Sequence, residues 1–500
     1  MRSAESAPRR YVVALLLGAA GVAAFAPLGG FPIAWLVLGG LYTLLGPLAD
    51  RHGPARAGAL VGGLFGLGGF LAGVSWVFVS LSTFGGMPAP VAAFATLLFC
   101  AAMALYPALA GALFVRLAPP VGWRRALVFA ALWTLAEWLR GWLLTGFPWL
   151  AVGYSQTPPS PLAGFAPLAG VYGVSLFTAL TGALLAETLL GGRRQGMRLI
   201  AGGALAALLL AGAALSGRGW TTPEGEALRV ALLQGNIAQD VKWRPERFEE
   251  SLRAYYHLMR DNPAQLTVLP ETALPVFFSE VPEDYLDALK QLAARNDGDL
   301  LFGIVTGDLT QYANSAVSLG ASGKQRYDKA HLVPFGEFIP PGFAWFMDMA
   351  HIPMSAFTPG DKAQLPLRID GHKIAVNICY EDAFGEEIIR ALPDATLLLN
   401  ISNVAWFGDS LAPAQHLQIA RMRALETGRM MLRATNTGMT AIIGADGAVQ
   451  AALPPFTRAA LTGEVRAYAG STPYVRWGNW PVVTVSLLLL AFARRRNTLS

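Results

Sequence analysis

The stretch KIAVNICYEDAF, from Lys373 to Phe384, starts as a branched apolar run and continues into a cysteine, a tyrosine and two acidic residues. A short apolar run bounded by polar residues is typical of a buried strand. Cys379 is one of only two cysteines among 500 residues, and it would lie where this strand ends. Its thiol is either buried and inert or retained for chemistry.

An α/β domain is expected around this stretch, from residue 227 to 467. Apolar runs with strand character alternate there with segments whose apolar residues recur at helical spacing. The expected strands are 228–237, 266–272, 300–307, 373–381 and 396–403. The expected helices are 244–260, 282–295 and 414–429. Strands that alternate with helices predict buried sheets covered by helices.

The first 216 residues have a different composition, because only four of the 33 acidic residues precede residue 217. They form seven apolar runs, each near the ~20 residues that cross a bilayer as a helix. The expected spans are 11–28, 31–48, 57–80, 88–115, 123–143, 165–190 and 197–216, with an eighth at 479–493. The first run leads directly into the second without a cleavage site, so we expect a retained span and not a signal peptide.

Arginines in the short loops predict the orientation of these spans, because basic residues are retained on the cytoplasmic side. They precede the first span and follow the second, fourth, sixth and last: Arg2, Arg9, Arg10, Arg51, Arg56, Arg116, Arg124, Arg125, Arg193, Arg194, Arg198, Arg494, Arg495 and Arg496. Both termini are therefore expected in the cytoplasm and the 227–467 domain outside. Cys100 would lie in the fourth span, so it is not an expected disulfide partner of Cys379.

Several classes of function are disfavoured by the motifs. The loop arginines account for the pI near 9.2, and no basic patch with interleaved aromatic residues suggests nucleic acid. Neither HExxH nor a GxSxG elbow is present. The histidines show no metal-ligand spacing: His52, His257, His331, His351, His372 and His416.

Polar side chains collect where the expected strands end. Glu271 ends 266–272, Cys379 and Glu381 end 373–381, and polar residues end 396–403. One such carboxylate is ordinarily a solvated strand end, but three such ends in one domain indicate a cleft. A thiol needs a base or a nearby cation to become a nucleophile. The run RYDKAHLVPFGEFIPP, residues 326–341, supplies Lys329 and Glu337, which alone would be a surface lysine and a loop glutamate.

Together these segments resemble a known superfamily. LPETALP with Glu271, DKAHLVPFGEFIP with Lys329 and NICYEDAF with Cys379 are similar to the Glu, Lys and Cys triad of the nitrilases, or carbon-nitrogen hydrolases. Three further stretches narrow the resemblance to the apolipoprotein N-acyltransferases, membrane enzymes that complete bacterial lipoprotein maturation. They are VSWVFVSLSTFGGMP (74–88), EWLRGWLLTGFPWLAVGYSQ (137–156) and NISNVAWFGDSLAPAQHLQIARMRALETGR (400–429). Soluble nitrilases have no membrane spans, so the first two stretches cannot derive from the broad superfamily.

The resemblance implies a fold with two parts. One is a membrane α-helical bundle of about eight transmembrane helices. The other is an extracytoplasmic α/β domain, a nitrilase-like αββα sandwich. The implied domains are the bundle at 1–220, the catalytic domain at 227–467, a final transmembrane helix at 478–494 and a cytoplasmic tail at 495–500.

The resemblance also implies catalytic roles. Cys379 would attack an ester carbonyl of a phospholipid and form a thioester. Glu271 would be the general base. Lys329, held by Glu337, would stabilise the oxyanion together with the backbone N–H that follows Cys379.

Further residues are expected to bind the substrate or to shape the pocket. Tyr380 and Glu381 would shape the pocket, and Trp149 and Trp243 would line the substrate route, although a tryptophan of a membrane protein is more often an interface anchor. Arg140 departs from the loop charge pattern. It could pair with Glu137 one helical turn earlier or bind a lipid phosphate, and these two possibilities do not exclude each other.

The implied acyl donor is a phospholipid, with phosphatidylethanolamine expected, and the implied acceptor is the α-amine of a diacylglyceryl-modified apolipoprotein. We expect a monomer in the bacterial inner membrane with its catalytic domain on the periplasmic side, and no cofactor or metal. Two alternatives stay open. One is a membrane-anchored nitrilase-type amidase that hydrolyses small periplasmic amides. The other is a transporter or lipid-handling scaffold, which the scarcity of charge within the spans disfavours.

Overall fold

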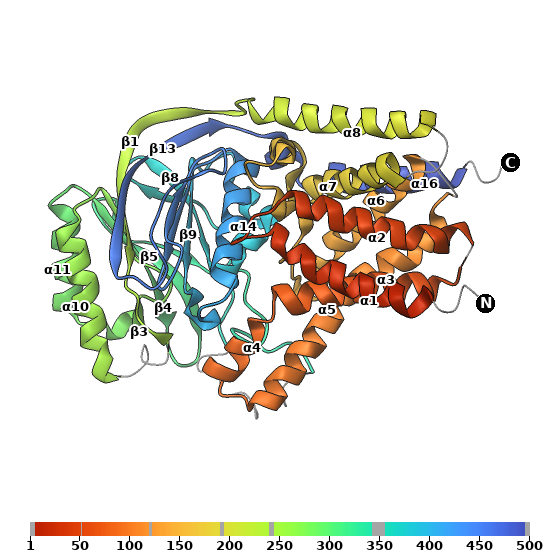
Figure 1. Cartoon of the computed structure of the whole chain (residues 1–500). Helices are drawn as coiled ribbons and strands as arrows, with labels where there is room; N and C mark the ends of the chain where they lie inside the picture. Colours follow the sequence, from red (N-terminus) through yellow and green to blue (C-terminus); the bar gives the residue numbers. More distant parts are fainter. Residues whose placement is uncertain are drawn as a thin grey trace. The chain divides into compact units, whose positions relative to one another are not determined.

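The computed structural model describes residues 6–51, 53–119, 123–190, 195–239, 245–342 and 356–495. The chain divides into two compact units (Figure 1). The helical unit comprises Met1–Val77, Pro90–Arg218 and Arg476–Ser500. The α/β unit comprises Phe78–Ala89 and Gly219–Val475.

Each of the eight apolar runs corresponds to a helix. These helices are α1 (Ser6–Gly21), α2 (Pro32–Asp50), α3 (Ala55–Gly73), α5 (Ala89–Leu117), α6 (Trp123–Arg140), α7 (Ala166–Leu190), α8 (Gln195–Ser216) and α16 (Trp480–Arg495). By length and composition, five described segments can cross a membrane: Pro32–Asp50, Ala55–Gly73, Ala89–Leu117, Pro161–Leu190 and Gln195–Ser216. The predicted membrane helical bundle is thereby confirmed.

Glycines let α3 and α5 approach each other closely. A Cβ added at Gly62 would lie 2.2 Å from the carbonyl oxygen of Pro107, and one added at Gly111 would lie 2.3 Å from that of Gly58. Small residues at such crossings are typical of membrane helices, where packing and not the hydrophobic effect holds helices together.

The third expected span, 57–80, is longer than the helix. α3 ends at Gly73, and Trp76 Nε1 donates to the carbonyl oxygen of Gly73 at 3.1 Å. The short helix α4 (Val77–Val79) and a π-helical turn (Ser80–Phe84) follow. The hydroxyl of Ser80 donates to the carbonyl oxygen of Trp406 at 2.8 Å, so the end of the expected span packs within the α/β unit.

The α/β unit contains two sheets. The first has the strand order β13-β1-β2-β4-β5-β6, with β3 also paired to β4, and the second has the order β12-β11-β10-β9-β8-β7. The strands of the first sheet are β1 (Thr221–Gln234), β2 (Leu266–Val268), β3 (Leu274–Phe277), β4 (Asp299–Gly307), β5 (Tyr312–Gly320), β6 (Gln325–Asp328) and β13 (Ala459–Gly470). Those of the second are β7 (Leu367–Ile369), β8 (His372–Ile378), β9 (Leu397–Ser402), β10 (Met431–Thr435), β11 (Ala441–Ile443) and β12 (Val449–Ala452).

Four layers follow from how the sheets are buried. The inner faces share one core, to which Leu232 and Val268 contribute from the first sheet and Ile378 and Leu432 from the second. The helices α10 (Pro245–Asp261) and α11 (Glu283–Ala294) cover the outer face of the first sheet. The helix α14 (Ala412–Thr427) covers the second, as Figure 1 shows. This order is the predicted αββα sandwich, so the fold class is confirmed.

Strand direction brings the polar strand ends together within each sheet. β8, β9 and β10 are parallel neighbours, and their register pairs Asn377 with Asn400 and Asn400 with Arg433. In the first sheet, β1, β2 and β4 are also parallel. The residues that follow β8 and β9 therefore meet at one edge of the second sheet.

Candidate active site

Cys379 follows β8 and begins a 3₁₀ turn, Cys379–Ala383. Its φ is 54°, which is the left-handed region that residues with a Cβ rarely occupy. Such a conformation costs on the order of 1–3 kcal/mol and recurs at functional sites. The cysteine is free and partly exposed. The turn therefore places the thiol at the end of β8, where it packs against the edge of the core between the sheets.

Lys329 follows β6 and is almost completely buried. Its Nζ lies 2.7 Å from Oε1 of Glu337 and 3.5 Å from Oε1 of Glu271. Burial acts to lower the pKa of Lys329, but the carboxylates of Glu337 and Glu271 outweigh it, and the net pKa is raised. Lys329 is therefore a permanent cation held between two carboxylates.

Glu271 is held by donors on both oxygens. Oε1 accepts from Asn314 Nδ2 at 2.8 Å, and Oε2 accepts from the backbone N–H of Asn403 at 2.8 Å. Asn314 Nδ2 also lies 3.0 Å from Oε1 of Glu337. Asn314 lies on β5 and was not predicted as a site residue. It ties the two carboxylates together.

A glycine on the neighbouring strand makes room for Glu271. A Cβ added at Gly303 of β4 would lie 2.5 Å from the Cα of Glu271 and 2.6 Å from the backbone nitrogen of Thr272. Both atoms belong to backbone and cannot rotate away. Gly303 therefore lets the turn that carries Glu271 lie directly against the sheet.

The Cys379 thiol is close enough to Glu271 and Lys329 for both charges to act on it. Burial and, to a smaller extent, the carboxylate of Glu271 raise the pKa of Cys379 to about 12, although the cation of Lys329 acts to lower it. At neutral pH the thiol is therefore protonated, and it needs a base at the moment of attack. The structure thus brings Glu271, Lys329 and Cys379 into one site.

Glu381 links the turn of Cys379 to the segment that follows Lys329. Its Oε1 accepts the backbone N–H groups of Ala330 and His331 at 2.7 and 3.0 Å, and its Oε2 accepts that of Ile378 at 2.7 Å. Burial raises the pKa of Glu381 to about 7, although these N–H groups act to lower it. Glu381 thus holds the turn of Cys379 and the segment after Lys329 together through backbone hydrogen bonds.

Tyr380 belongs to a small aromatic cluster. Its ring lies 4.9 Å from that of Phe384 and 5.8 Å from that of His331, both edge to face. The His331 ring stacks on Phe384 at 3.7 Å, and His331 Nδ1 lies 3.1 Å from Oε2 of Glu387. These rings therefore pack against one another in the segments that follow Cys379 and Lys329.

Two family models match different parts of the chain. Residues 17–184 match the apolipoprotein N-acyltransferase N-terminal domain, and residues 229–474 match the carbon-nitrogen hydrolase domain. The apolipoprotein N-acyltransferase of Nitrosomonas europaea is 49% identical over 500 residues, which cover 98% of this chain and 99% of that protein. The chain belongs to the apolipoprotein N-acyltransferase family.

A second member of the family is also similar to this chain over nearly its full length. The apolipoprotein N-acyltransferase of Chromobacterium violaceum is 47% identical, over 97% of this chain and 94% of its own.

Among solved structures, a CN-hydrolase superfamily protein from Xanthomonas campestris is similar over 52% of this chain and 97% of its own, with 17% identity and a TM-score of 0.36. A carbon-nitrogen hydrolase from Helicobacter pylori has 18% identity and a TM-score of 0.37, over 53% and 93%.

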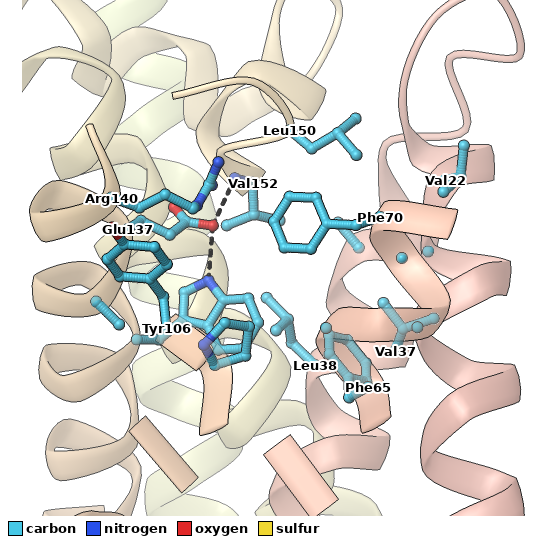
Figure 2. A pocket seen from close by; sticks show the side chains of 18 of the residues that line it. Val22, Val37, Leu38, Phe65, Phe70, Tyr106, Glu137, Arg140, Leu150 and Val152 are labelled. Carbon is cyan, nitrogen blue, oxygen red and sulfur yellow. Dashed lines mark hydrogen bonds between the residues drawn. The ribbon is translucent and has the colours of Figure 1, made fainter. Parts of the chain in front are cut away.

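The helical unit of this family member contains a cavity of about 80 Å³ (Figure 2). Its lining is mostly apolar, with Glu137 and Arg140 as the charged residues, and none of the triad candidates lines it. Oε1 of Glu137 accepts from the indole of Trp133 at 3.0 Å and from the backbone N–H of Val152 at 2.9 Å. Glu137 thereby ties the loop after α6 back to the helix.

Arg140 holds the same loop. Its NH1 donates to the carbonyl oxygens of Phe147 at 2.5 Å and Trp149 at 2.6 Å, and its guanidinium lies over the Phe70 ring at 5.2 Å. Arg140 and Glu137 line the same cavity and interact electrostatically, although no hydrogen bond joins them within the described residues. Binding of Arg140 to a lipid phosphate stays a prediction.

Of the two candidate tryptophans, Trp149 is buried against Trp76 at 5.3 Å and Phe147 at 6.3 Å between ring centroids. Its contacts are those of a packed core side chain, and its role on a substrate route stays a prediction. Trp243 lies outside the described residues. Within the part of the chain that the structure describes, no group of three or more His, Cys, Asp and Glu could hold a metal ion.

Proposed function

We propose that this protein transfers an acyl chain from a membrane phospholipid to the α-amine of a diacylglyceryl-cysteine at the N-terminus of an apolipoprotein. The family relationship supports N-acyl transfer to an apolipoprotein. The observation that carries the proposal is the site itself, where a free thiol, a carboxylate and a fixed cation share one end of the α/β unit. Transfer would proceed through a thioester on Cys379.

In the first half-reaction, Glu271 takes the proton of the Cys379 thiol while Sγ attacks the ester carbonyl carbon of the phospholipid. The oxyanion would be stabilised by Lys329 and by the backbone N–H of Tyr380. The bond between the carbonyl carbon and the glycerol oxygen then breaks. The glycerol oxygen takes the proton back from Glu271, and a lysophospholipid leaves.

In the second half-reaction, the neutral α-amine of the apolipoprotein attacks the thioester carbonyl. Glu271 takes one proton from the attacking nitrogen, and the same two donors stabilise the second oxyanion. The carbon-sulfur bond breaks, Sγ recovers a proton from Glu271, and the acyl chain remains on nitrogen as an amide. A protonated resting thiol fits this cycle, because the first half-reaction starts from the protonated thiol and the second regenerates it.

The geometry favours auxiliary roles around the triad for three further residues. Glu337 keeps Lys329 charged, since its carboxylate raises the pKa of the ammonium against the effect of burial. Glu381 braces the two catalytic segments through backbone N–H groups. Tyr380 contributes its backbone N–H and an aromatic ring.

We further propose that the enzyme is a monomer of the bacterial inner membrane and that phosphatidylethanolamine is the donor. The loop arginines support cytoplasmic termini and a periplasmic catalytic domain. On this arrangement the bundle is 1–220, the catalytic domain 227–467, the last span 478–494 and the tail 495–500.

The test is the intact mass of the purified protein after incubation with phospholipid alone. The wild type should gain one acyl group that hydroxylamine removes and that Cys379→Ala cannot acquire, with Cys100→Ala as the matched cysteine control. Release of free fatty acid without an adduct, or hydrolysis of small water-soluble amides, would instead support the anchored amidase.

A further inference from the structure

Three polar side chains that the proposed reaction does not use are buried directly behind Cys379. Asp382, His416 and Arg433 are each at most 1% exposed. Oδ1 of Asp382 lies 2.7 Å from Nε2 of His416, and its Oδ2 lies 3.0 Å from NH1 of Arg433. Burying charged groups costs several kcal/mol unless each is paired. The pairing accounts for how the fold tolerates this cluster, but not for why the cluster is present.

The cluster reaches the backbone of the nucleophile by two routes. Nε2 of His416 lies 3.2 Å from the carbonyl oxygen of Cys379. NH1 of Arg433 donates to Oδ1 of Asn400 at 2.7 Å, and Nδ2 of the same Asn400 donates to the Cys379 carbonyl at 3.1 Å. Two donors therefore converge on one carbonyl oxygen, and Asp382 orients both through His416 and Arg433.

The protonation of His416 follows from its surroundings. Burial lowers the pKa of His416, the charge of Arg433 lowers it further, and Asp382 opposes both. The imidazole is therefore neutral at physiological pH. Because both neighbours of Nε2 are acceptor oxygens, Nε2 carries the proton. It shares this one N–H between Oδ1 of Asp382 and the carbonyl oxygen of Cys379.

The carbonyl of Cys379 and the N–H of Tyr380 belong to one peptide group. That group is planar and trans, so its C=O and N–H point in opposite directions. Fixing the oxygen on one side therefore fixes the direction of the N–H on the other. Such fixing matters here because Cys379 has a φ of 54°. This conformation is strained and would relax without support.

We propose that Asp382, His416 and Arg433 are positioning residues for acyl transfer, and that they aim the Tyr380 N–H at the oxyanion by clamping the Cys379 carbonyl. Asn400 connects Arg433 to this carbonyl through its side-chain amide. Donors on the carbonyl also polarise the peptide and strengthen its N–H as a donor. The inference rests on the proposed function, since it assigns the Cys379 turn to a covalent reaction.

The test uses the full-length protein in lipid nanodiscs, acylated by a phospholipid with a ¹³C-labelled acyl carbonyl. Infrared difference spectra report the carbonyl stretch of the thioester, which a hydrogen bond moves to lower frequency. His416→Leu should move the band to higher frequency and lower the transfer rate at saturating substrate about tenfold to hundredfold. The KM for phospholipid should stay unchanged, because the clamp does not contact the acyl chain.

Two further variants separate positioning from folding. His416→Gln keeps an N–H donor and should restore most of the band position and rate. Met422→Ala removes a fully buried side chain from the same helix without touching Cys379, so it should lower thermal stability and leave the band in place.

The outcomes are distinguishable. A wild-type thioester with the same band and rate in His416→Leu overturns the inference alone. Absence of a thioester in the wild type overturns the proposed function and the inference with it. If His416→Leu does not fold, Asn400→Asp replaces the second donor by an acceptor of the same shape that still faces Arg433. An unmoved band in that variant also overturns the inference.

Discussion

The ammonium of Lys329 and the carboxylate of Glu337 form a buried ion pair, with 2.7 Å between Nζ and Oε1. A buried lysine tends to lose its proton, because low dielectric surroundings disfavour the charged form. Here the carboxylates reverse that tendency and raise the pKa of Lys329. The charge proposed to stabilise the oxyanion is therefore maintained by Glu337, which the proposed mechanism does not require to touch the reacting atoms.

Replacing Glu337 by Gln should expose this dependence. The variant loses one of the two carboxylates that raise the pKa of Lys329, so that pKa falls while the desolvation remains. We expect kcat about a hundredfold lower, with a further decline at alkaline pH as the amine becomes neutral. The measurement is the pH profile of kcat. Glu386→Gln, an exposed glutamate on α13 (Gly385–Ile388), is the control, and a parallel profile for Glu337→Gln would contradict the account.

Glu271→Gln should separate thiol ionisation from catalysis. The carboxylate of Glu271 raises the pKa of Cys379, so its removal lowers that pKa and makes the thiolate more abundant. Alkylation of the Cys379 peptide by iodoacetamide should therefore reach its midpoint at lower pH. Acyl transfer should nonetheless fall about 10² to 10⁴-fold, because the general base is gone. The exposed Glu280→Gln should change neither quantity, and an alkylation midpoint that rises in Glu271→Gln would refute the electrostatic assignment.

Asn314→Leu tests the link between the two carboxylates. The amide donates to Glu271 at 2.8 Å and to Glu337 at 3.0 Å. Hydrogen bonds to charged groups are worth roughly 1.5–3 kcal/mol. We therefore expect kcat to fall about tenfold to hundredfold with an unchanged KM, measured with a fluorescent phospholipid donor. Ser318→Ala, another buried position on β5, is the control, and full activity in Asn314→Leu would remove Asn314 from the site.

Glu381 should make stability depend on pH. Its pKa rises from the ordinary 4.5 to about 7 in the folded protein. Between these values the folded state binds more protons than the unfolded state, so the free energy of unfolding falls as pH rises. Its stabilising contribution is complete below pH 4.5 and is lost by pH 7, a change of roughly 3 kcal/mol at most.

The measurement for Glu381 is the apparent Tm between pH 5 and 7.5 in detergent. The wild type should lose stability with rising pH, and Glu381→Gln should show a smaller slope because the titrating group is absent. Equal slopes in the two proteins would mean that another group titrates in this range.

The membrane helices could be predicted from the sequence because length and apolarity are local properties. The end of α3 could not, since residues 74–80 remain apolar although α3 ends at Gly73. The hydrogen bond from Ser80 to Trp406 joins residues more than 300 positions apart. No local pattern reports such a contact.

Five strands and three helices of the α/β unit were predicted from alternating patterns, and each matches an observed element within about four residues at either end, except that β1 begins seven residues earlier than expected. Among the strands that were missed are β5 and β10, because YANSAVSLG and MLRAT are short or carry polar residues. Their absence hid Asn314 and Arg433. Arg433 lies beside Asn400 because of the register between β10 and β9. The periodicity of a sequence carries no information on the register between two strands.

Glu271 and Cys379 could be found because polar residues after apolar strands are conspicuous, whereas Lys329 follows the polar strand β6 and became a candidate only through the resemblance. Gly303 could also have been predicted, because an isolated glycine inside a strand pattern often marks a close backbone approach. The cluster of Asp382, His416 and Arg433 could not, because its members come from three elements and meet only in the folded chain.

The most direct test of the central claim is a single-turnover chase of the isolated acyl-enzyme. The protein is loaded from a phospholipid with a deuterated acyl chain, freed of lipid donor and mixed with a diacylglyceryl-cysteine peptide. We predict that the label leaves Cys379 and appears as N-acyl peptide in equal amount and on the same time course, with hydrolysis much slower. Label that appears as free fatty acid at a rate independent of the peptide would contradict transfer through Cys379.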